Sequence, residues 1–353
     1  MTIVDTPNGV GFRKVMSGTK REREVQEELI APKKQCLGTQ KLQFHGSVTV
    51  SADQEKSEVT DSFSTYPLRI VQQDNWLPHA SLSILGFGGG VVSEDRIALN
   101  LNVTENATAS VKTIGPKKIY RATDGKKSSQ EFHTKVEKNA LLVFSPEPIS
   151  CAEDSTYNAT HEFVVQQDAS LVFVDWFTSG RQNKNEFWQY NSFENHLRIF
   201  SDESDRCLFF EDQCIQNDSE NRVNIFNQLV KECDQVQVCG TLLLLGPRTQ
   251  QIRSSLKDLQ TRQSFLQTRQ IPFHVTNISD DLMVVKFTAA SQQYGYELLV
   301  ELLRPLRSEL NGRIPYEEHI HYDQTYPSTD NSFSSSTANT ISMIQDNRDI
   351  VIV

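Results

Sequence analysis

RIALNLNVT, residues 96–104, is the stretch that decides the fold class of this chain. Its apolar side chains at positions 97, 99, 101 and 103 alternate with Asn100 and Asn102. Successive side chains of a β-strand point to opposite faces, so this period of two predicts a strand with one buried face and one polar face.

Comparable short runs extend in both directions from this strand. They cover residues 42–50, 66–71, 81–85, 109–114, 141–144, 171–176, 197–200 and 207–210. Turn signals such as Glu105-Asn106 and Glu137-Lys138-Asn139 separate them. Short strands that do not alternate with long helices predict a mainly β fold, built as a sandwich, a barrel or a β-helical stack.

The spacing of the apolar residues changes after residue 215. Apolar residues at helical spacing predict helices over residues 220–233, 247–270 and 291–304, with a strand at 282–287 between the last two. We therefore expect three parts: a flexible N-terminal arm over residues 1–38, a β scaffold with a helical C-terminal part over 39–311, and a low-complexity tail over 312–353.

Composition and charge exclude several classes of protein. The chain has 353 residues and a formal net charge of -10, whereas nucleic-acid binding requires clustered Lys and Arg. No apolar run approaches the roughly 18 residues of a membrane span. The first twenty residues lack the apolar run of a secretory signal, and six cysteines do not suggest a disulfide framework. The sequence therefore predicts a cytoplasmic protein that binds neither nucleic acid nor membrane.

The motifs that usually indicate catalysis are incomplete here. Gly86-Phe-Gly-Gly-Gly90 lacks the Gly-Lys-Ser/Thr end of a phosphate-binding loop, so we interpret it as a close approach between strands. The spacing of the cysteines does not match a zinc site, which favours buried structural thiols. One alternative stays open: a β-sandwich module or enzyme that acts on a glycan. Trp176 and Trp188 are its candidate stacking surfaces, although aromatic residues in strands usually face the core.

His319-Ile-His321 is the one local pair of residues that resembles a metal site. Glu317, Glu318 and Asp323 lie nearby in the sequence. Imidazole and carboxylate groups suit nickel or zinc, so His319 and His321 are weak candidates for metal ligands. The alternative is that the two histidines are close by chance in a loose C-terminal segment.

A series of segments in a fixed order resembles the urease accessory protein UreD (UreH) family over about residues 38–310. The segments are Tyr66-Pro-Leu-Arg69, Gly88-Gly-Gly-Val-Val-Ser-Glu-Asp95, Gly115-Pro-Lys-Lys-Ile-Tyr-Arg121, Asn139-Ala-Leu-Leu-Val-Phe-Ser-Pro-Glu-Pro-Ile149, Ala169-Ser-Leu-Val-Phe-Val-Asp175 and Gly180-Arg181 with Glu186-Phe187.

The resemblance implies a β-helix-like stack of strands with a smaller helical C-terminal part. It also implies a non-catalytic chaperone in urease metallocentre assembly. UreD proteins bind urease on one side and UreF on the other, and UreF holds the GTPase UreG, which brings nickel for insertion. No tightly bound cofactor is expected, only transient Ni²⁺, for which carboxylates that release the ion are more suitable than a tight cysteine site.

Matching to the family's motifs selects Asp95, Glu186 and Asp175 as acidic positions on or near a nickel route. Each has a structural alternative. In the structural alternatives, Asp95 caps a turn, and Glu186 pairs with Arg181 or Arg121 to fix the end of a strand. Buried carboxylates often have such structural roles.

Overall fold

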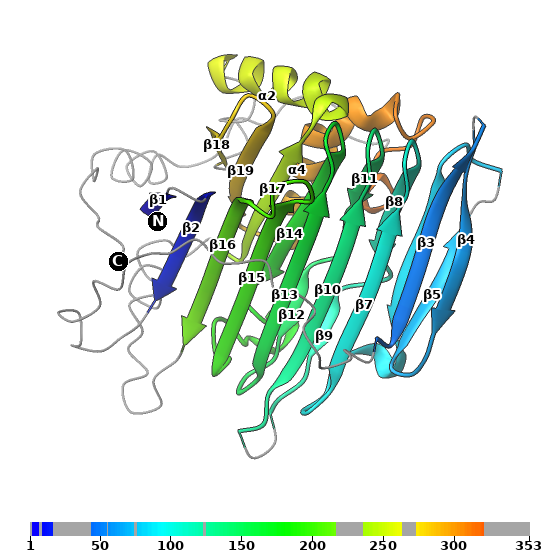
Figure 1. Cartoon of the computed structure of the whole chain (residues 1–353). Coiled ribbons are helices and arrows are strands. Elements are labelled where there is room, and N and C mark those ends of the chain that lie inside the picture. Colours follow the sequence, from blue (N-terminus) through cyan, green and yellow to red (C-terminus); the bar gives the residue numbers. More distant parts are fainter. Residues whose placement is uncertain are drawn as a thin grey trace, which may run out of the picture.

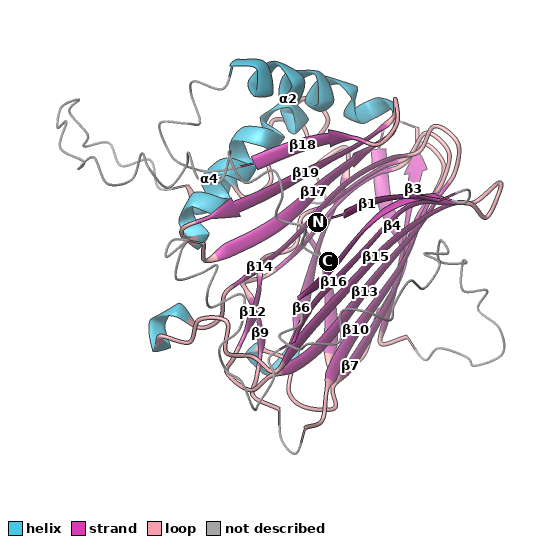
Figure 2. Cartoon of the chain, turned by 90° about the vertical axis from the view of Figure 1, so that its left-hand side faces the viewer, coloured by secondary structure: helices cyan, strands magenta, loops and turns pink. Residues whose placement is uncertain are grey.

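The structure is a computed structural model that describes residues 2–6, 9–16, 44–54, 56–73, 76–122, 125–216, 236–262 and 273–320. Within these ranges, two β-sheets face each other and helices cover the outer face of one of them (Figures 1 and 2). The described part of the chain contains no helix that is long and apolar enough to cross a membrane.

One sheet, which we call sheet A, has nine strands. In spatial order they are β1 (Thr2–Thr6), β2 (Gly9–Met16), β16 (Cys207–Gln216), β15 (Ser192–Ser201), β13 (Thr156–Val165), β10 (Ser128–Val136), β7 (Arg96–Val103), β3 (Gly46–Asp53) and β4 (Lys56–Ser64).

The opposite sheet, sheet B, has eight strands in its main path and two beside it. The path runs through β18 (Phe273–Asn277), β19 (Leu282–Ala289), β17 (Val238–Leu245), β14 (Ser170–Thr178), β11 (Leu141–Phe144), β8 (Thr108–Thr113), β6 (Ala80–Gly86) and β5 (Leu68–Gln73). The short strands β12 (Ile149–Cys151) and β9 (Lys117–Ile119) pair with each other, and β12 also pairs with β14.

The middle of the chain winds between the two sheets as a stack of coils. Strands β7, β10, β13 and β15 join sheet A and β8, β11 and β14 join sheet B in alternation, and the neighbours within each set are parallel. Equivalent residues therefore stack, as Leu99, Phe132, His161 and Leu197 do across four strands. This arrangement confirms the predicted mainly β, β-helix-like fold.

The turns between coils repeat as well. Asn106, Asn139 and Asp168 all have positive φ, which Asn and Asp tolerate better than most residues. The Asn139 side chain donates a hydrogen bond of 3.2 Å to the Asn106 side chain one coil away. The Asn and Asp residues in these turns thus set the reversal of the chain and link successive coils.

The main hydrophobic core lies between the sheets, and a second core lies between sheet B and the helices. On β14, Leu171, Phe173 and Phe177 belong to the first core, while Val172 and Val174 belong to the second. Every residue of β14 is buried, as expected for a strand that is covered on both faces. Sheet A instead shows strict alternation, for example along β13.

The second core is closed by α2 (Gln250–Arg262) and α4 (Gln292–Leu303). The Ser291 side chain caps α4 by accepting a hydrogen bond of 3.2 Å from the Tyr294 N–H. Gly295 allows α4 close to Trp176, because a Cβ there would lie 2.8 Å from the indole ring. Both elements match predicted helices, and β19 matches the predicted strand; the helix predicted over residues 220–233 lies outside the described residues.

Short 3₁₀ turns complete the structure: η1 (Phe87–Gly89), η2 (Gln182–Lys184), η3 (Pro247–Thr249), η4 (Arg304–Arg307) and η5 (Glu317–His319). At the glycine-rich segment, a Cβ on Gly90 would lie 2.5 Å from the Tyr120 ring and 2.7 Å from the Lys118 carbonyl. The interpretation of this segment as a close approach between strands is therefore confirmed.

Candidate functional site

Five polar residues interrupt the hydrophobic core between the two sheets. We call Asp175, Asn195, Glu211, Thr241 and Lys286 the interior cluster. The first four are at most 5% exposed. Burial of this many polar and charged groups is unfavourable unless they are paired, so their presence in a core calls for an explanation.

Strand register brings three of these residues into one row of sheet B. Asp175 on β14 lies directly opposite Thr241 on β17, and Thr241 lies opposite Lys286 on β19. Asp175 belongs to the interior face of β14, between Phe173 and Phe177 of the main core. The row therefore points into the space between the sheets.

Sheet A supplies the other two residues, which bond across the interior. The Asn195 amide on β15 donates a hydrogen bond to Asp175 Oδ2. The Lys286 ammonium contacts Glu211 Oε1 on β16, and it donates a hydrogen bond of 2.5 Å to Thr241 Oγ1. The Thr241 hydroxyl in turn lies 3.4 Å from Glu211 Oε2. The five side chains thus connect the sheets at two neighbouring points, one between Asn195 and Asp175 and one between Glu211 and the pair Thr241 and Lys286.

Burial sets the electrostatics of this region. It raises the pKa of Asp175 to about 6; the hydrogen bond from Asn195 opposes this shift and the charge of Glu211 adds to it. Burial also lowers the pKa of Lys117 to about 7, an effect that Asp175 partly offsets. For His161, burial and then the charge of Lys117 lower the pKa to about 3. The interior therefore holds one carboxyl group and one amine with pKa values of about 6 and about 7, and a histidine that burial keeps neutral.

Some polar atoms in the interior have no hydrogen-bond partner within the part of the chain that the structure describes. They include Asn195 Oδ1, the Tyr157 hydroxyl and His161 Nδ1. Buried polar groups are normally satisfied, and an exception indicates water or an ion. Asn195 is 2% exposed and donates to Asp175 through its amide nitrogen, so its amide oxygen is a buried acceptor next to that contact.

The interior cluster therefore offers carboxylate, amide and hydroxyl oxygens to a cation. Oxygen donors suit hard, hydrated divalent ions. Among the described residues, no three His, Cys, Asp or Glu side chains come together as a group that could enclose a metal. The arrangement is suited to a passing contact with a hydrated cation rather than to a closed structural site.

Asp175 is the predicted route residue that lies in this interior. Asp95 lies elsewhere, in the turn before β7, where its Oδ2 accepts a hydrogen bond of 3.0 Å from the Val92 N–H. Its neighbour Glu94 pairs with Lys126 at 2.8 Å. The structure gives Asp95 the turn contact that the structural alternative expects, and a role in nickel passage stays a prediction.

Glu186 forms an ion pair with Arg181 in the loop between β14 and β15. The Arg181 guanidinium donates two hydrogen bonds to the carboxylate, of 2.6 and 2.5 Å, and the Glu153 N–H donates a third of 3.0 Å. The hydrogen bond from Arg181 lowers the pKa of Glu186. Arg121 instead pairs with Glu153. The pairing of Glu186 thus matches its structural alternative, while its role in nickel passage stays untested.

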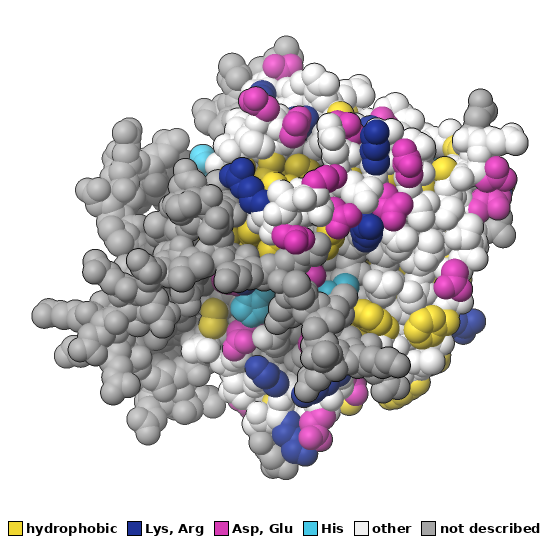
Figure 3. Space-filling view, viewed as in Figure 1, with side chains coloured by type: hydrophobic (Ala, Val, Ile, Leu, Met, Phe, Trp, Pro, Cys, Tyr) yellow, Lys and Arg dark blue, Asp and Glu magenta, His cyan; other side chains and the backbone are white. Residues whose placement is uncertain are grey.

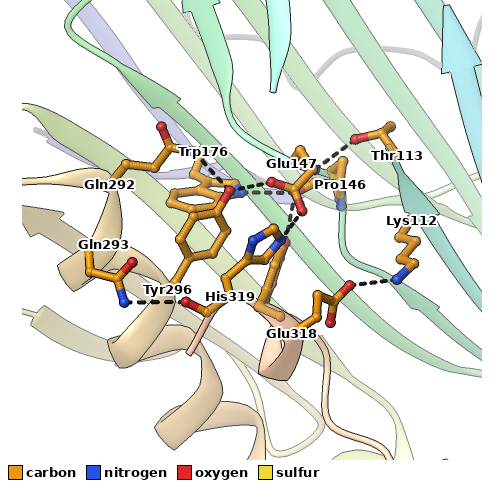
Figure 4. Close-up of polar contacts among 11 residues, drawn as sticks. Lys112, Thr113, Pro146, Glu147, Trp176, Gln292, Gln293, Tyr296, Glu318 and His319 are labelled. Carbon is orange, nitrogen blue, oxygen red and sulfur yellow. Dashed lines mark hydrogen bonds and ion pairs between the residues drawn. The ribbon is translucent and has the colours of Figure 1, made fainter. Parts of the chain in front are cut away.

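His319 lies on the outer side of sheet B, where its Nε2 is 2.8 Å from Glu147 Oε1 (Figure 4). Its ring stacks on Tyr296 with centroids 4.1 Å apart. Its neighbour Glu318 forms an ion pair of 2.5 Å with Lys112. His321 lies outside the described residues, so the predicted metal pair stays a prediction.

Glu147 is the centre of this second polar group, which joins the C-terminal elements to the β stack (Figure 4). The Tyr296 hydroxyl of α4 donates to its Oε2, and its backbone N–H donates a hydrogen bond of 2.8 Å to Thr113 Oγ1. Trp176 Nε1 donates a hydrogen bond of 2.9 Å to the adjacent Pro146 carbonyl. The Pro-Glu-Pro segment carries no local signal in the sequence that predicts these contacts.

Two further predictions concern cysteine and tryptophan. Cys151 and Cys207 are buried, as expected for structural thiols, whereas Cys214 and Cys239 are only partly buried. Trp176 and Trp188 are 1% and 2% exposed, so neither forms a surface on which a sugar ring could stack. Their burial agrees with the expectation that aromatic residues in strands face the core, and it removes the candidate stacking surfaces of the glycan alternative.

Sequence reasoning missed Glu211, Lys286 and the two neutral members of the interior cluster. A signal did exist for the two charges, because Glu211 follows Leu208-Phe-Phe210 and Lys286 stands within Leu282-Met-Val-Val-Lys-Phe287. A charged residue inside an apolar strand is expensive to bury, which makes it a candidate for function. Asn195 and Thr241 carry no such signal.

Comparisons with known proteins identify the family of this chain. The model of the UreD urease accessory protein family matches residues 44–322. Urease accessory protein D of Oryza sativa subsp. indica is 28% identical over 300 residues, covering 77% of this chain and 94% of the rice protein. Urease accessory protein UreD of Cytophaga hutchinsonii is 26% identical over 240 residues, covering 68% of this chain and 80% of the bacterial protein. The chain belongs to the UreD urease accessory protein family.

Proposed function

We propose that this protein is a non-catalytic urease maturation factor that links urease to UreF and UreG and assists the delivery of nickel to the urease active site. Membership of the UreD family supports the role in urease maturation. A cytoplasmic location and action as a chaperone belong to the same proposal. The nickel ion is cargo here, so it passes through the protein and is not kept as a cofactor.

The observation that carries the nickel part of the proposal is the interior cluster. Asp175 and Glu211 place two carboxylates between the sheets, each only 5% exposed. With Asn195 and Thr241 they present oxygen donors, which hold a hydrated divalent ion without trapping it. On this proposal Ni²⁺ travels between the sheets and contacts these oxygens.

An exposed apolar group supports the proposal of protein partners. Tyr66 and Phe87 are 71% and 46% exposed, and their ring centroids lie 5.9 Å apart. Ile114, 53% exposed, follows β8, which is the neighbour of β6. Figure 3 shows hydrophobic side chains at the lower right of this face, where Figure 1 places β4 and β5. Exposed apolar patches often mark protein interfaces.

The test is urease activation in nickel-supplied cells that express urease, UreF and UreG with or without this chain. We expect active, nickel-containing urease only when the chain is present. Asp175→Asn should then lower the nickel content of urease while pull-downs still recover urease and UreF, because the substitution is internal. Equal activation with and without the chain, with the other proteins shown to work, would overturn the proposal.

A further inference from the structure

We propose that Lys286 is a tethered counter-cation: its ammonium occupies the oxygen-lined position in the interior cluster, and an arriving divalent cation displaces it. The inference rests on the proposed function, because it explains how that same cluster would accept and release its cargo. It assigns a role to a residue that is not an acid and not a ligand.

Lys286 holds the position that a cation would need. Its Nζ contacts Glu211 Oε1 and lies 2.5 Å from Thr241 Oγ1. It also belongs to the same row of sheet B as Asp175, with Thr241 between them. Two of the cluster's four oxygen-bearing side chains are thus coordinated to the ammonium, in the way they would coordinate a metal ion.

A divalent ion carries one more positive charge than the ammonium that it would replace. Asp175 and Glu211 carry two negative charges when ionised, and the charge of Lys286 offsets one of them. A divalent ion would neutralise both carboxylates, since the attraction between opposite charges in a poorly solvated site is strong.

The Lys286 side chain is partly exposed, so its ammonium has access to solvent. Its side chain is 19% exposed, whereas that of Glu211 is 6% exposed. It projects from β19, which has only the short edge strand β18 beyond it in sheet B. A lysine stem is flexible, and its charged end readily moves into water while the stem stays in place. Displacement therefore moves one charge into solvent without breaking the β stack.

One acceptor atom of the cluster receives no hydrogen bond from Lys286. Asn195 Oδ1 has no hydrogen-bond partner among the described residues, and the side chain is 2% exposed. Through its amide nitrogen, the same side chain is hydrogen-bonded to Asp175. A divalent ion between Asp175 and Glu211 would use this acceptor together with both carboxylates.

Exchange between the Lys286 ammonium and the divalent ion lowers the affinity of the cluster for that ion. Each ion that enters must first separate the ammonium from Glu211, and the returning ammonium helps to expel the ion. The affinity of the cluster for Ni²⁺ is thereby reduced below that of the same oxygens without Lys286. Low affinity is what a carrier requires, because cargo that is held tightly does not move on.

The experiment measures Ni²⁺ binding to the full chain by equilibrium dialysis with radioactive nickel alone. Lys286→Met keeps most of the side-chain volume and removes the charge, so we expect the Kd for Ni²⁺ to fall at least about tenfold. Lys286→Gln removes the charge but keeps a donor for Glu211, and the same decrease is expected. Having two variants guards against misfolding of either one. Lys112→Met is the matched control, because it removes a lysine paired with Glu318 on the exposed side of sheet B, and its Kd should equal that of the wild type.

The outcomes separate this inference from the proposed function. Asp175→Asn could weaken nickel binding while Lys286→Met and Lys286→Gln stay within twofold of the wild type. That result would overturn the displacement of Lys286 and would still support a contact between nickel and the interior cluster. If none of the three substitutions changes nickel binding, the contact itself is wrong, and with it the nickel part of the proposed function. A tenfold fall in the Lys112→Met control would also overturn the inference, because the effect would then not be specific to Lys286.

Discussion

The interior cluster and the group around Glu147 bury carboxylates to the same extent by different means. Asp175, Glu211 and Glu147 are each 5% exposed. Glu147, on the outer side of sheet B, is held by the Tyr296 hydroxyl and the His319 ring. Glu211, inside the sandwich, is held by the Lys286 ammonium.

The difference lies in what each set of partners can do. Tyr296 and His319 are 149 and 172 residues away from Glu147 in the sequence, so their contacts fasten α4 and η5 to the β stack. The Lys286 ammonium sits on a flexible stem, and in our proposal another cation replaces it. Equal burial therefore accompanies two roles: attachment of the C-terminal elements at Glu147 and a proposed exchangeable charge in the interior cluster.

The largest expected effect comes from breaking the interior ion pair. Glu211→Gln leaves the Lys286 ammonium without its carboxylate, and loss of one partner of a buried pair costs about 3–5 kcal/mol of unfolding free energy. Urea denaturation at pH 7 measures the change. Glu318→Gln is the control, since it breaks the exposed pair with Lys112, which contributes at most about 1 kcal/mol. Equal losses in the two variants would contradict the contrast between the regions.

The pH dependence of stability gives the next largest effect. Burial raises the pKa of Asp175 from 3.8 to about 6. As pH rises from about 4 to about 6, the unfolded chain has already lost this proton while the folded chain still binds it, so stability falls. Each unit by which the pKa of Asp175 differs between the folded and the unfolded chain corresponds to about 1.4 kcal/mol of unfolding free energy. Asp175→Asn should therefore be more stable than the wild type by about 3 kcal/mol at pH 7.

That comparison is made by chemical denaturation at pH 4 and pH 7, with a chelator present to remove metal ions. At pH 4 the wild type and Asp175→Asn should differ little, because the carboxyl group is then protonated in the folded chain. A variant that is destabilised equally at both pH values would show that Asp175 acts through its hydrogen bond with Asn195 and not through buried charge.

A smaller effect is expected at the outer group. Tyr296→Phe removes the hydroxyl that donates to Glu147 and accepts from Gln292, which should cost about 2 kcal/mol of unfolding free energy. Tyr294→Phe on the same helix is the matched control, because Tyr294 is 44% exposed, and its stability should stay within about 0.5 kcal/mol of the wild type. Nickel binding should be unchanged in both variants; a loss in Tyr296→Phe would connect the two regions.

Much of the fold could be predicted because strand alternation and turn residues can be recognised in short stretches of sequence. The alternation in residues 96–104 and the turn signals at Asn106 and Asn139 identified strands and reversals that the structure contains. The predicted strands did not include β10 or β13. In β10 the buried positions include Ser128, Gln130 and Thr134, so the alternation of apolar and polar residues is weak. Their identity as strands depends on parallel neighbours on both sides, which no local pattern records.

The site was less predictable because it depends on register between distant strands. Motif matching found Asp175, but its hydrogen bond with Asn195 depends on how the two sheets face each other. Thr241 and Lys286 join it only because β17 and β19 are antiparallel in the observed register. A shift of one residue in either strand would send these side chains to the opposite face.

The smallest expected effect is at Asp95, where the prediction from motifs can be separated from the structural alternative. Asp95→Asn keeps an oxygen that accepts the Val92 N–H, so the turn and the unfolding free energy should stay within about 0.5 kcal/mol of the wild type. We expect the nickel content of activated urease to change less than twofold, because Asp95 lies in a partly exposed turn and not in the interior cluster. A larger decrease at unchanged stability would place Asp95 on the nickel route, and the comparison would then extend from the interior cluster to the turn before β7.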